Sequence, residues 1–400
     1  MLRRNIHTKK TTTLYNSIFI IWAFTFCLTG VAQEIEKSIF ITANTAETEK
    51  TGVLSQMVKD AADTPNSMLL VLGNAASKEG FKTTVDQQLQ ILKKLKKEVV
   101  FIPGTNEWNH GGFEGVQHIE KYIQKNSKAK FYPDDGEPIK KHNLSDNVVL
   151  ITIDSQWYLE DWNKHTYINE ASDIQNRTLF FLEFENQIKK AQGKIKIIAI
   201  HHPIETLTKQ GLVRNTAAPS VQHYQNAQYK ILRRRLKTIA RLNEDIIFVS
   251  GSDKNLQYIN KRVPQIISGA AGTTKTVKNS KDGSFATAEN GYSRLDINAD
   301  GKVSVHFFTV DNGASKSVFE TIIFKGDTNK TETYKSFVTD FSNTQKAAIY
   351  TKEATDKSGF YKSLWGDHYR EYYSKLVDAP VVLLDTLMGG LKPLKRGGGQ

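Results

Sequence analysis

Polar residues follow several short apolar runs of this sequence, at the points where predicted strands end. Their side chains are of the types that bind metal ions, exchange protons or attack esters: they are Asn44, Asn74 and Ser77, the run Gly104-Thr105-Asn106-Glu107, the pair His201-His202, and the run Gly251-Ser252-Asp253-Lys254. In open α/β sheets, ligands gather outside the carboxyl ends of the strands. We therefore expect these loops to share one site.

The types of these residues leave three kinds of role open. His201 can bind a single metal ion together with Asp253 or Glu107, since imidazole and carboxylate groups are common metal ligands. Ser252 can act as a nucleophile with His201 as its base, although the sequence shows neither an orienting acid nor an oxyanion hole. The third role is packing or second-shell support, for both His201 and His202.

The elements that position these loops alternate between strand and helix. Buried strands are predicted where apolar runs of four to six residues are bounded by polar turns. They are 38–41, 68–72, 99–102, 148–153, 195–200 and 246–249. Helices are predicted over 84–97, 179–192 and 225–242. Strands that alternate with helices favour an α/β domain with a central sheet.

The pattern changes after about residue 262, where consecutive strands replace the alternation. We expect strands at 263–267, 283–288, 292–297, 302–310 and 317–324, with turns such as 298–301 between them. No helix is evident in this half. We expect it to complete the sheets in antiparallel fashion.

The order and spacing of the loops, with their flanks, resemble the calcineurin-like metallophosphoesterases and, within them, the purple-acid-phosphatase-like group. The resemblance covers about residues 37–310. It is carried by Phe101-Ile-Pro-Gly104, Trp108-Asn-His-Gly-Gly112, Leu150-Ile-Thr-Ile-Asp-Ser-Gln-Trp157, Ile200-His-His-Pro203, Asn255-Leu-Gln-Tyr258 and Ile267-Ser-Gly-Ala270. It implies a four-layer α/β/β/α sandwich of two mixed sheets. It also implies phosphoester hydrolysis by two divalent metals, Fe, Mn or Zn, which activate a water molecule.

This sequence departs from the family's motifs at most of the positions that hold the metals. Asn44 and Asn74 stand where the family has aspartates, and Ser77 replaces a tyrosine ligand. Thr105 and Asn106 replace the asparagine ligand and the histidine proton donor, while Ser252 and Lys254 replace two histidine ligands. His201 remains as a strong ligand, and Glu107 matches a position that supports the family's catalytic histidine. With Asn106 beside it, we expect Glu107 to form an ion pair or face water.

These departures change the charge of the site. Two carboxylates are lost and the ammonium of Lys254 is gained. An ammonium at 4 Å from a dication is repelled by roughly 8 kcal/mol at an effective dielectric constant near 20. We therefore expect no dinuclear metal site and no cofactor. We also expect Lys254 to hydrogen-bond to Asn44 or Asn74.

The first 32 residues are typical of a secretory signal. Four basic residues precede the apolar run 18–28, and Ala32 offers a small-residue cleavage position. An uncleaved N-terminal anchor is the alternative. Cys27, the single cysteine, lies in this segment, so the chain has no disulfide framework and no cysteine-based zinc site. We expect export to the periplasm, the outer membrane or the cell surface of a Gram-negative-type envelope.

The sequence predicts three parts: a signal peptide at 1–32, a phosphoesterase-like domain at 33–324 and a polar connector at 325–400. The connector, from Tyr361 onward, is similar to the segment that precedes an outer-membrane β-barrel in exported members of the family. This resemblance implies an outer-membrane protein as partner, or a barrel in a longer chain. Whether this chain retains phosphoester hydrolysis stays open. The favoured function is binding or assembly, and the alternative is an active hydrolase with an altered or single-metal site.

Two further groups of residues are candidates for binding. Arg233, Arg234 and Arg235 form the densest basic cluster in a chain of net charge +12 and can bind a polyanion. The cluster is not interleaved with stacking aromatic residues, so specific nucleic-acid recognition is not expected. Trp157 and Trp162 lie near a predicted strand end, either in the core or on a ligand surface.

Overall fold

The computed structural model describes residues 34–77, 79–165, 167–208, 226–278 and 283–326. Two seven-stranded sheets form its centre. The first has the order β14-β13-β12-β1-β2-β3-β4, with β1 at Ile35–Thr42, β2 at Ser67–Val71, β3 at Glu98–Phe101, β4 at Lys130–Phe131, β12 at Gly291–Asn298, β13 at Lys302–Asp311 and β14 at Ala314–Lys325. The second has the order β11-β9-β10-β8-β7-β6-β5, with β5 at Ile139–Asn143, β6 at Val148–Ile153, β7 at Ile195–Ile200, β8 at Ile246–Ser250, β9 at Leu256–Ile259, β10 at Gln265–Ser268 and β11 at Phe285–Thr287.

Both sheets are mixed. Strands β1 to β4 are parallel in the first sheet, and β6, β7, β8 and β10 are parallel in the second. The other pairs are antiparallel. The central parallel strands β2, β6, β7 and β8 are buried along their whole length. This explains their continuous apolar runs, because a parallel strand is covered on both faces.

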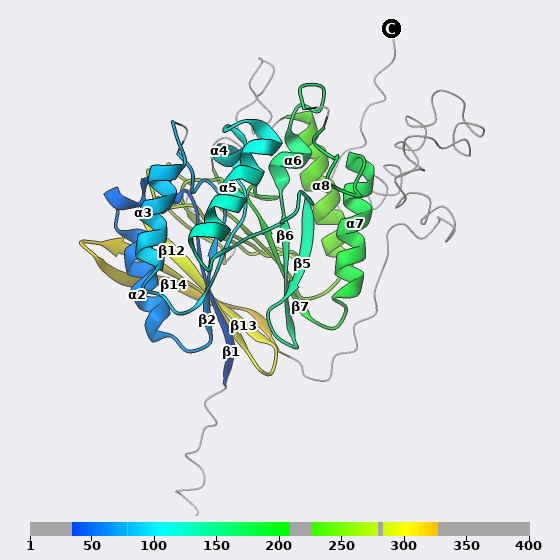
Figure 1. Ribbon diagram of the computed structural model, residues 1–400. Helices are drawn as coiled ribbons and strands as arrows, with labels where there is room; N and C mark the ends of the chain where they lie inside the picture. The colour runs from blue at the N-terminus through cyan, green and yellow to red at the C-terminus, as the bar shows by residue number, and fades with distance from the viewer. Residues whose placement is uncertain (1–33, 78, 166, 209–225, 279–282, 327–400) are drawn as a thin grey trace, which may run out of the picture.

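Helices cover the outer face of each sheet. They are the 3₁₀ helix η1 at Thr45–Lys50, α2 at Val53–Asp63, α3 at Lys82–Leu92, α4 at Thr105–Trp108, α5 at Gly112–Asn126, α6 at Ser155–Leu159, α7 at Arg177–Lys190 and α8 at Ala227–Arg241. Figure 1 shows α2 and α3 on one side of the sheets and α7 and α8 on the other.

Two apolar clusters fill the spaces between these layers. One lies between the sheets and joins side chains such as Ile39 and Leu70 of the first to Leu150 and Val249 of the second. The other lies under the helices. The result is a four-layer α/β/β/α sandwich, and the predicted fold class is confirmed.

Most predicted elements are present, and the differences concern one boundary, one pairing and several elements that were not predicted. The helix predicted over 84–97 ends at Leu92. The second half of the chain is not wholly antiparallel, because β10 pairs with β8 in parallel. The elements that were not predicted are the helices η1, α2, α4, α5 and α6 and the strands β4, β5 and β9.

The predicted signal peptide, including Cys27, lies outside the described residues, and so does the connector beyond Gly326. The domain boundary predicted at residue 324 falls one residue before the end of β14. Within the described ranges, none of the helices combines the length and the hydropathy that crossing a bilayer requires.

Candidate functional site

The carboxyl ends of the parallel strands bring most of the polar loops together. Asn44 follows β1, Asn74 follows β2 and Gly104 follows β3, while His201 follows β7 and Gly251 follows β8. A Cβ atom on Gly104 would lie 2.8 Å from both the Asn74 nitrogen and His201 Cε1. The loops of both sheets therefore meet at one edge, as the sequence predicted.

Asn44 spans the gap between the two sheets. Its Nδ2 group donates to the carbonyl oxygens of Gly251 and Gly269, each at 2.8 Å. Both glycines directly follow strands of the second sheet, whereas Asn44 belongs to the first. Asn44 is 4% exposed and has a φ of 59°, a left-handed conformation that asparagine adopts more readily than most residues. Its amide is therefore a buried cross-link.

The orientation of Asn44 determines that of its neighbours. Because Nδ2 faces two carbonyl groups, Oδ1 must face a donor, and Asn74 supplies it through Nδ2 at 2.8 Å. Oδ1 of Asn74 then accepts from the backbone N–H of Asn106 at 2.9 Å. The Asn106 amide in turn donates to the carbonyl of Ala76 at 2.9 Å. Each amide thus has a single orientation that satisfies all its neighbours.

Glu107 is the acidic member of this cluster, and it is completely buried. Its carboxylate accepts three backbone N–H groups, from Asn74 at 2.9 Å, Ala76 at 2.9 Å and Gly104 at 2.7 Å. The expectation that Glu107 forms an ion pair or faces water is wrong, because the loop amides surround it. We call Asn44, Asn74, Asn106 and Glu107 the amide network.

His201 crosses between the sheets in the opposite direction. Its Nδ1 lies 2.6 Å from the carbonyl oxygen of Leu72, next to the first sheet, so this nitrogen carries the proton and donates. Nε2 is then a lone-pair acceptor, and it has no hydrogen-bond partner among the described residues. Burial lowers the pKa of His201, opposed by the Leu72 carbonyl and the Glu107 carboxylate. The imidazole is therefore neutral.

His202 is also buried, and it bonds to a serine that the sequence analysis did not single out. Its Nδ1 lies 2.8 Å from Ser155 Oγ, and its Nε2 lies 3.4 Å from Thr105 Oγ1. Burial, together with the neighbouring His201, lowers the pKa of His202 well below its ordinary value. Ser155 lies in the stretch 150–157 that carries part of the family resemblance. Its contact with His202 follows from its position at the start of α6, which the sequence did not predict.

The remaining predicted positions do not join the amide network. Ser77 donates to the carbonyl of Gly80 in an exposed turn. The Asp253 carboxylate accepts from Thr206 and Thr208, and burial raises its pKa. Ser252 contacts His201 through its backbone, with N–H to carbonyl at 2.8 Å. In the described ranges no hydrogen bond links its hydroxyl to either histidine, so the nucleophile arrangement is not formed.

The expected hydrogen bond from Lys254 to Asn44 or Asn74 is not made between these described residues. Oδ1 of each asparagine instead faces a donor of the amide network, which is Asn74 Nδ2 for Asn44 and the Asn106 N–H for Asn74. The backbone carbonyl of Lys254 accepts from the Lys275 N–H at 2.7 Å.

The residues present do not fit a pair of divalent metals. Asn44 directs an NH₂ group, not an oxygen, toward the second sheet. The Glu107 oxygens already accept hydrogen bonds from three backbone N–H groups. The described part of the chain holds no group of three or more His, Cys, Asp or Glu side chains placed to bind a metal ion. Beside the amide network, Nε2 of His201 has no hydrogen-bond partner among the described residues and suits a metal, but a single nitrogen ligand does not hold a dication.

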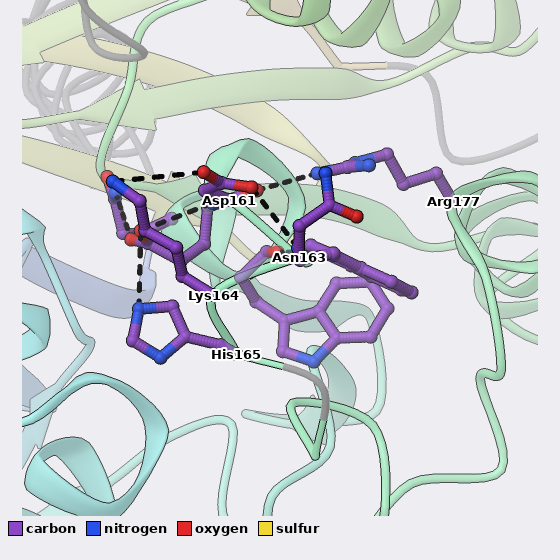
Figure 2. A network of polar contacts seen from close by, with 9 residues as sticks. Asp161, Asn163, Lys164, His165 and Arg177 are labelled. Atoms are coloured by element: carbon purple, nitrogen blue, oxygen red, sulfur yellow. Dashed lines mark hydrogen bonds and ion pairs between the residues drawn. The ribbon is translucent and has the colours of Figure 1, made fainter.

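A well-anchored loop follows α6 on one side of the site. Figure 2 shows its polar contacts, in which Arg177 donates to the carbonyls of Tyr158 and Glu160, each at 2.7 Å. His165 Nε2 lies 3.6 Å from Glu160 Oε1. A Cβ atom on Gly112 would lie 2.6 Å from His165 Cε1, so this ring packs directly on the start of α5. The loop is thereby fixed to both α7 and α5.

The two tryptophans of this region differ in exposure. Trp157 is 1% exposed, donates its indole N–H to the carbonyl of Ile168 and stacks on Phe180. It therefore belongs to the core, and the ligand-surface alternative does not apply to it. Trp162 is half-buried, with the Arg177 guanidinium 4.8 Å from its ring.

The basic cluster of α8 is not one continuous surface patch. Arg235 is 4% exposed and lies over the ring of Phe181 at 4.7 Å. A polyanion cannot reach it there, so the cluster at the surface is reduced to the half-buried Arg233 and Arg234.

The comparisons with known proteins agree with this architecture. No protein-family model matches the sequence, and no curated protein matches it significantly. Among solved structures, the chain is similar to GAP50, described as the anchor in the inner membrane complex of Plasmodium. The TM-score is 0.51 at 14% identity, over 74% of this chain and 91% of that one.

Two further structures have comparable coverage. PhoD matches with a TM-score of 0.50 at 9% identity, over 76% of this chain and 72% of that one. The calcineurin-like phosphoesterase YfkN from Bacillus subtilis matches with a TM-score of 0.36 at 12% identity, over 72% and 90%. At these identities the likeness concerns the fold alone. The two mixed seven-stranded sheets and their helices are consistent with the calcineurin-like phosphoesterase fold.

Proposed function

We propose that this chain is an exported, non-catalytic protein that uses the phosphoesterase fold for binding or assembly in the cell envelope. It holds no pair of divalent metals and does not hydrolyse phosphoesters. An outer-membrane protein is the proposed partner.

The observation that carries this proposal is the closed hydrogen bonding of the amide network. Asn44 and Asn74 stand where the resemblance implies metal-binding aspartates, and both are occupied by protein donors and acceptors. A metal ion would have to displace these bonds, and breaking buried hydrogen bonds costs about 1–3 kcal/mol for each group left unpaired. A dication would gain much less binding energy from neutral amides than from carboxylates, since amides bring no negative charge to it.

The burial of the histidines supports the same conclusion. His201 is 0% exposed and His202 is 1% exposed. A general acid or base must come within hydrogen-bond reach of the substrate, and neither ring is open to a phosphoester. Both imidazoles are also neutral, so they attract no phosphate by charge.

Location in the envelope rests on the N-terminal sequence, with its basic start, its apolar run and Ala32. A structural role for this fold also has a parallel, because GAP50 is described as an anchor. Mass spectrometry of the protein from a fractionated native host tests the export. A mature chain that begins at Gln33 in the envelope fraction supports it, and a full-length chain in the cytosol contradicts it.

The alternative function is a hydrolase with a single-metal site. The unpaired Nε2 of His201 is the observation that favours it. The two candidates differ in one measurement, the hydrolysis of p-nitrophenyl phosphate with added Mn²⁺, Fe²⁺ or Zn²⁺. We expect no turnover above that of the His201→Ala variant. Turnover that depends on the metal and disappears in His201→Ala establishes the hydrolase instead.

The partner is tested by isolation from membranes. We expect the tagged native protein, extracted in mild detergent, to co-purify with one outer-membrane protein at a fixed ratio. Recovery as a monomer without any stoichiometric partner contradicts the assembly function.

A further inference from the structure

The amide of Asn44 stands where the resemblance implies a metal-binding aspartate, and its hydrogen bonds point to a structural role for this side chain. In the four-layer arrangement, the loops at the carboxyl ends of the parallel strands of the two sheets lie against each other. Three buried side chains cross between them here. Asn44 donates from the first sheet to Gly251 and Gly269 of the second, and His201 donates from the second to Leu72 of the first. Ser268, at the end of β10, donates its hydroxyl to the Ile41 carbonyl of β1 at 2.6 Å.

We propose that the Nδ2 group of Asn44 takes the place of a bridging cation and locks the two sheets together without metal. Aspartate at this position would restore the need for a cation. The proposal does not depend on whether the chain hydrolyses phosphoesters, because its test measures stability.

The geometry around Asn44 supports this substitution of an amide for a cation. Nδ2 lies 2.8 Å from two carbonyl oxygens, and an NH₂ group places one hydrogen on each. The backbones of Gly251 and Gly269 are themselves anchored, because their N–H groups donate to the carbonyls of His201 at 3.1 Å and Asn255 at 3.0 Å. A Cβ atom on Gly269 would lie 1.9 Å from the Asp253 carbonyl oxygen, and one on Gly251 would lie 2.2 Å from Ala43 Cβ. The two carbonyl groups therefore keep a positive partner between them.

Aspartate at position 44 would turn the attraction between residue 44 and the two glycine carbonyls into a repulsion. A carboxylate oxygen would face the carbonyl oxygens of Gly251 and Gly269 with no proton between them. The backbone would not be strained, because aspartate, like asparagine, adopts the left-handed conformation found at residue 44. Carboxylate and carbonyl oxygens together are the ligands that Ca²⁺ and Mn²⁺ prefer. The repulsion is therefore relieved when such a cation binds.

The experiment measures thermal unfolding of the full mature chain in EDTA and in millimolar Mn²⁺ or Ca²⁺. For the unaltered protein we expect the same Tm in all three conditions. For Asn44→Asp we expect a Tm lower by about 5 °C or more in EDTA, with at least half of the loss recovered by one of the cations. Asn66→Asp is the matched control, since Asn66 has the same left-handed backbone but is exposed; its Tm should change little and show no metal dependence.

Three outcomes overturn the proposal. They are a Tm of the unaltered protein that falls in EDTA, an Asn44→Asp variant as stable in EDTA as the control, and a loss that neither cation reverses. If Asn44→Asp does not fold, Asn74→Asp provides the same comparison. It removes only the donation from Asn74 Nδ2 to Asn44 Oδ1, and we expect a smaller fall in Tm with the same recovery. The hydrolysis assay is read separately, so its result does not decide this one.

Discussion

Asn44 and His201 both hydrogen-bond to the backbone of Gly251. The Gly251 carbonyl accepts from Asn44 Nδ2 at 2.8 Å, and the Gly251 N–H donates to the His201 carbonyl at 3.1 Å. This glycine therefore lies where the first loop of one sheet meets the histidine loop of the other. Its environment leaves no room for a side chain, since a Cβ atom would lie 2.7 Å from the Leu72 carbonyl oxygen.

Gly251→Ala should therefore destabilise the protein. The added methyl group would collide with Ala43 and Leu72 beside the first sheet, and overpacking of this kind costs about 1–3 kcal/mol. Gly80→Ala is the matched control, because a Cβ atom there meets nothing within 4 Å. Urea denaturation of both variants measures the difference, and equal midpoints would show that the Gly251 loop yields easily.

Asp154 makes the stability depend on pH. Its carboxyl group caps α6 and accepts from the Trp108 indole N–H at 2.9 Å. Burial raises the pKa of Asp154 to about 7. Hydrogen bonds from Trp157, Trp108 and Gln156 oppose this rise, and the charge of Glu107 adds to it. Between about pH 4 and 7 the folded state then binds more protons than the unfolded state. This group's contribution is complete below pH 4 and is lost as the pH rises through 7.

The difference in unfolding free energy between the unaltered protein and Asp154→Asn isolates that contribution. Three pKa units correspond to roughly 4 kcal/mol at most. We expect the difference to shift in favour of Asn as the pH rises from 4 to 7, in denaturant titrations at several pH values. A difference that is constant over this range would mean that Asp154 keeps its ordinary pKa in the folded protein.

Glu107→Gln tests the carboxylate of the amide network. Glutamine has one acceptor oxygen, and its NH₂ group would face a backbone N–H that Glu107 now accepts. Leaving buried donors unpaired costs about 1–3 kcal/mol each, so we expect a loss of about 2–4 kcal/mol by chemical denaturation. Glu79→Gln changes an exposed residue and should stay within about 0.5 kcal/mol. Similar losses in both variants would contradict the buried arrangement.

The sequence predicts the strands best where burial is complete. The runs 148–153 and 195–200 match β6 and β7 residue for residue, because a strand covered on both faces must be apolar throughout. Strand β4 has only two residues, and β5 reads Ile-Lys-Lys-His-Asn. Neither strand has a hydrophobic pattern that identifies it from the sequence. Both lie at the edge of a sheet, where pairing with the neighbouring strand specifies a strand more than its composition does.

The site is predictable in its location but not in its hydrogen bonding. Strand ends place Asn44, Asn74 and His201 together, and these meet as expected. Which way each amide points depends on carbonyls from residues 207 and 225 positions away along the chain. The contact expected of Lys254 is not made among the described residues, and a charge argument could not foresee this, because it ranks partners without knowing which donors the neighbouring loops supply.

Arg177→Lys tests the loop that Figure 2 shows beside the site. The planar guanidinium donates to two carbonyls, of Tyr158 and Glu160, and lies 4.8 Å from the Trp162 ring. A lysine ammonium is not planar and cannot reproduce this fork and stacking together. We expect a loss of about 1–3 kcal/mol and faster amide hydrogen exchange in residues 158–165. Arg262→Lys, at an exposed position, should change neither quantity. Unchanged exchange in Arg177→Lys would show that His165, packed on Gly112, is enough to hold the loop.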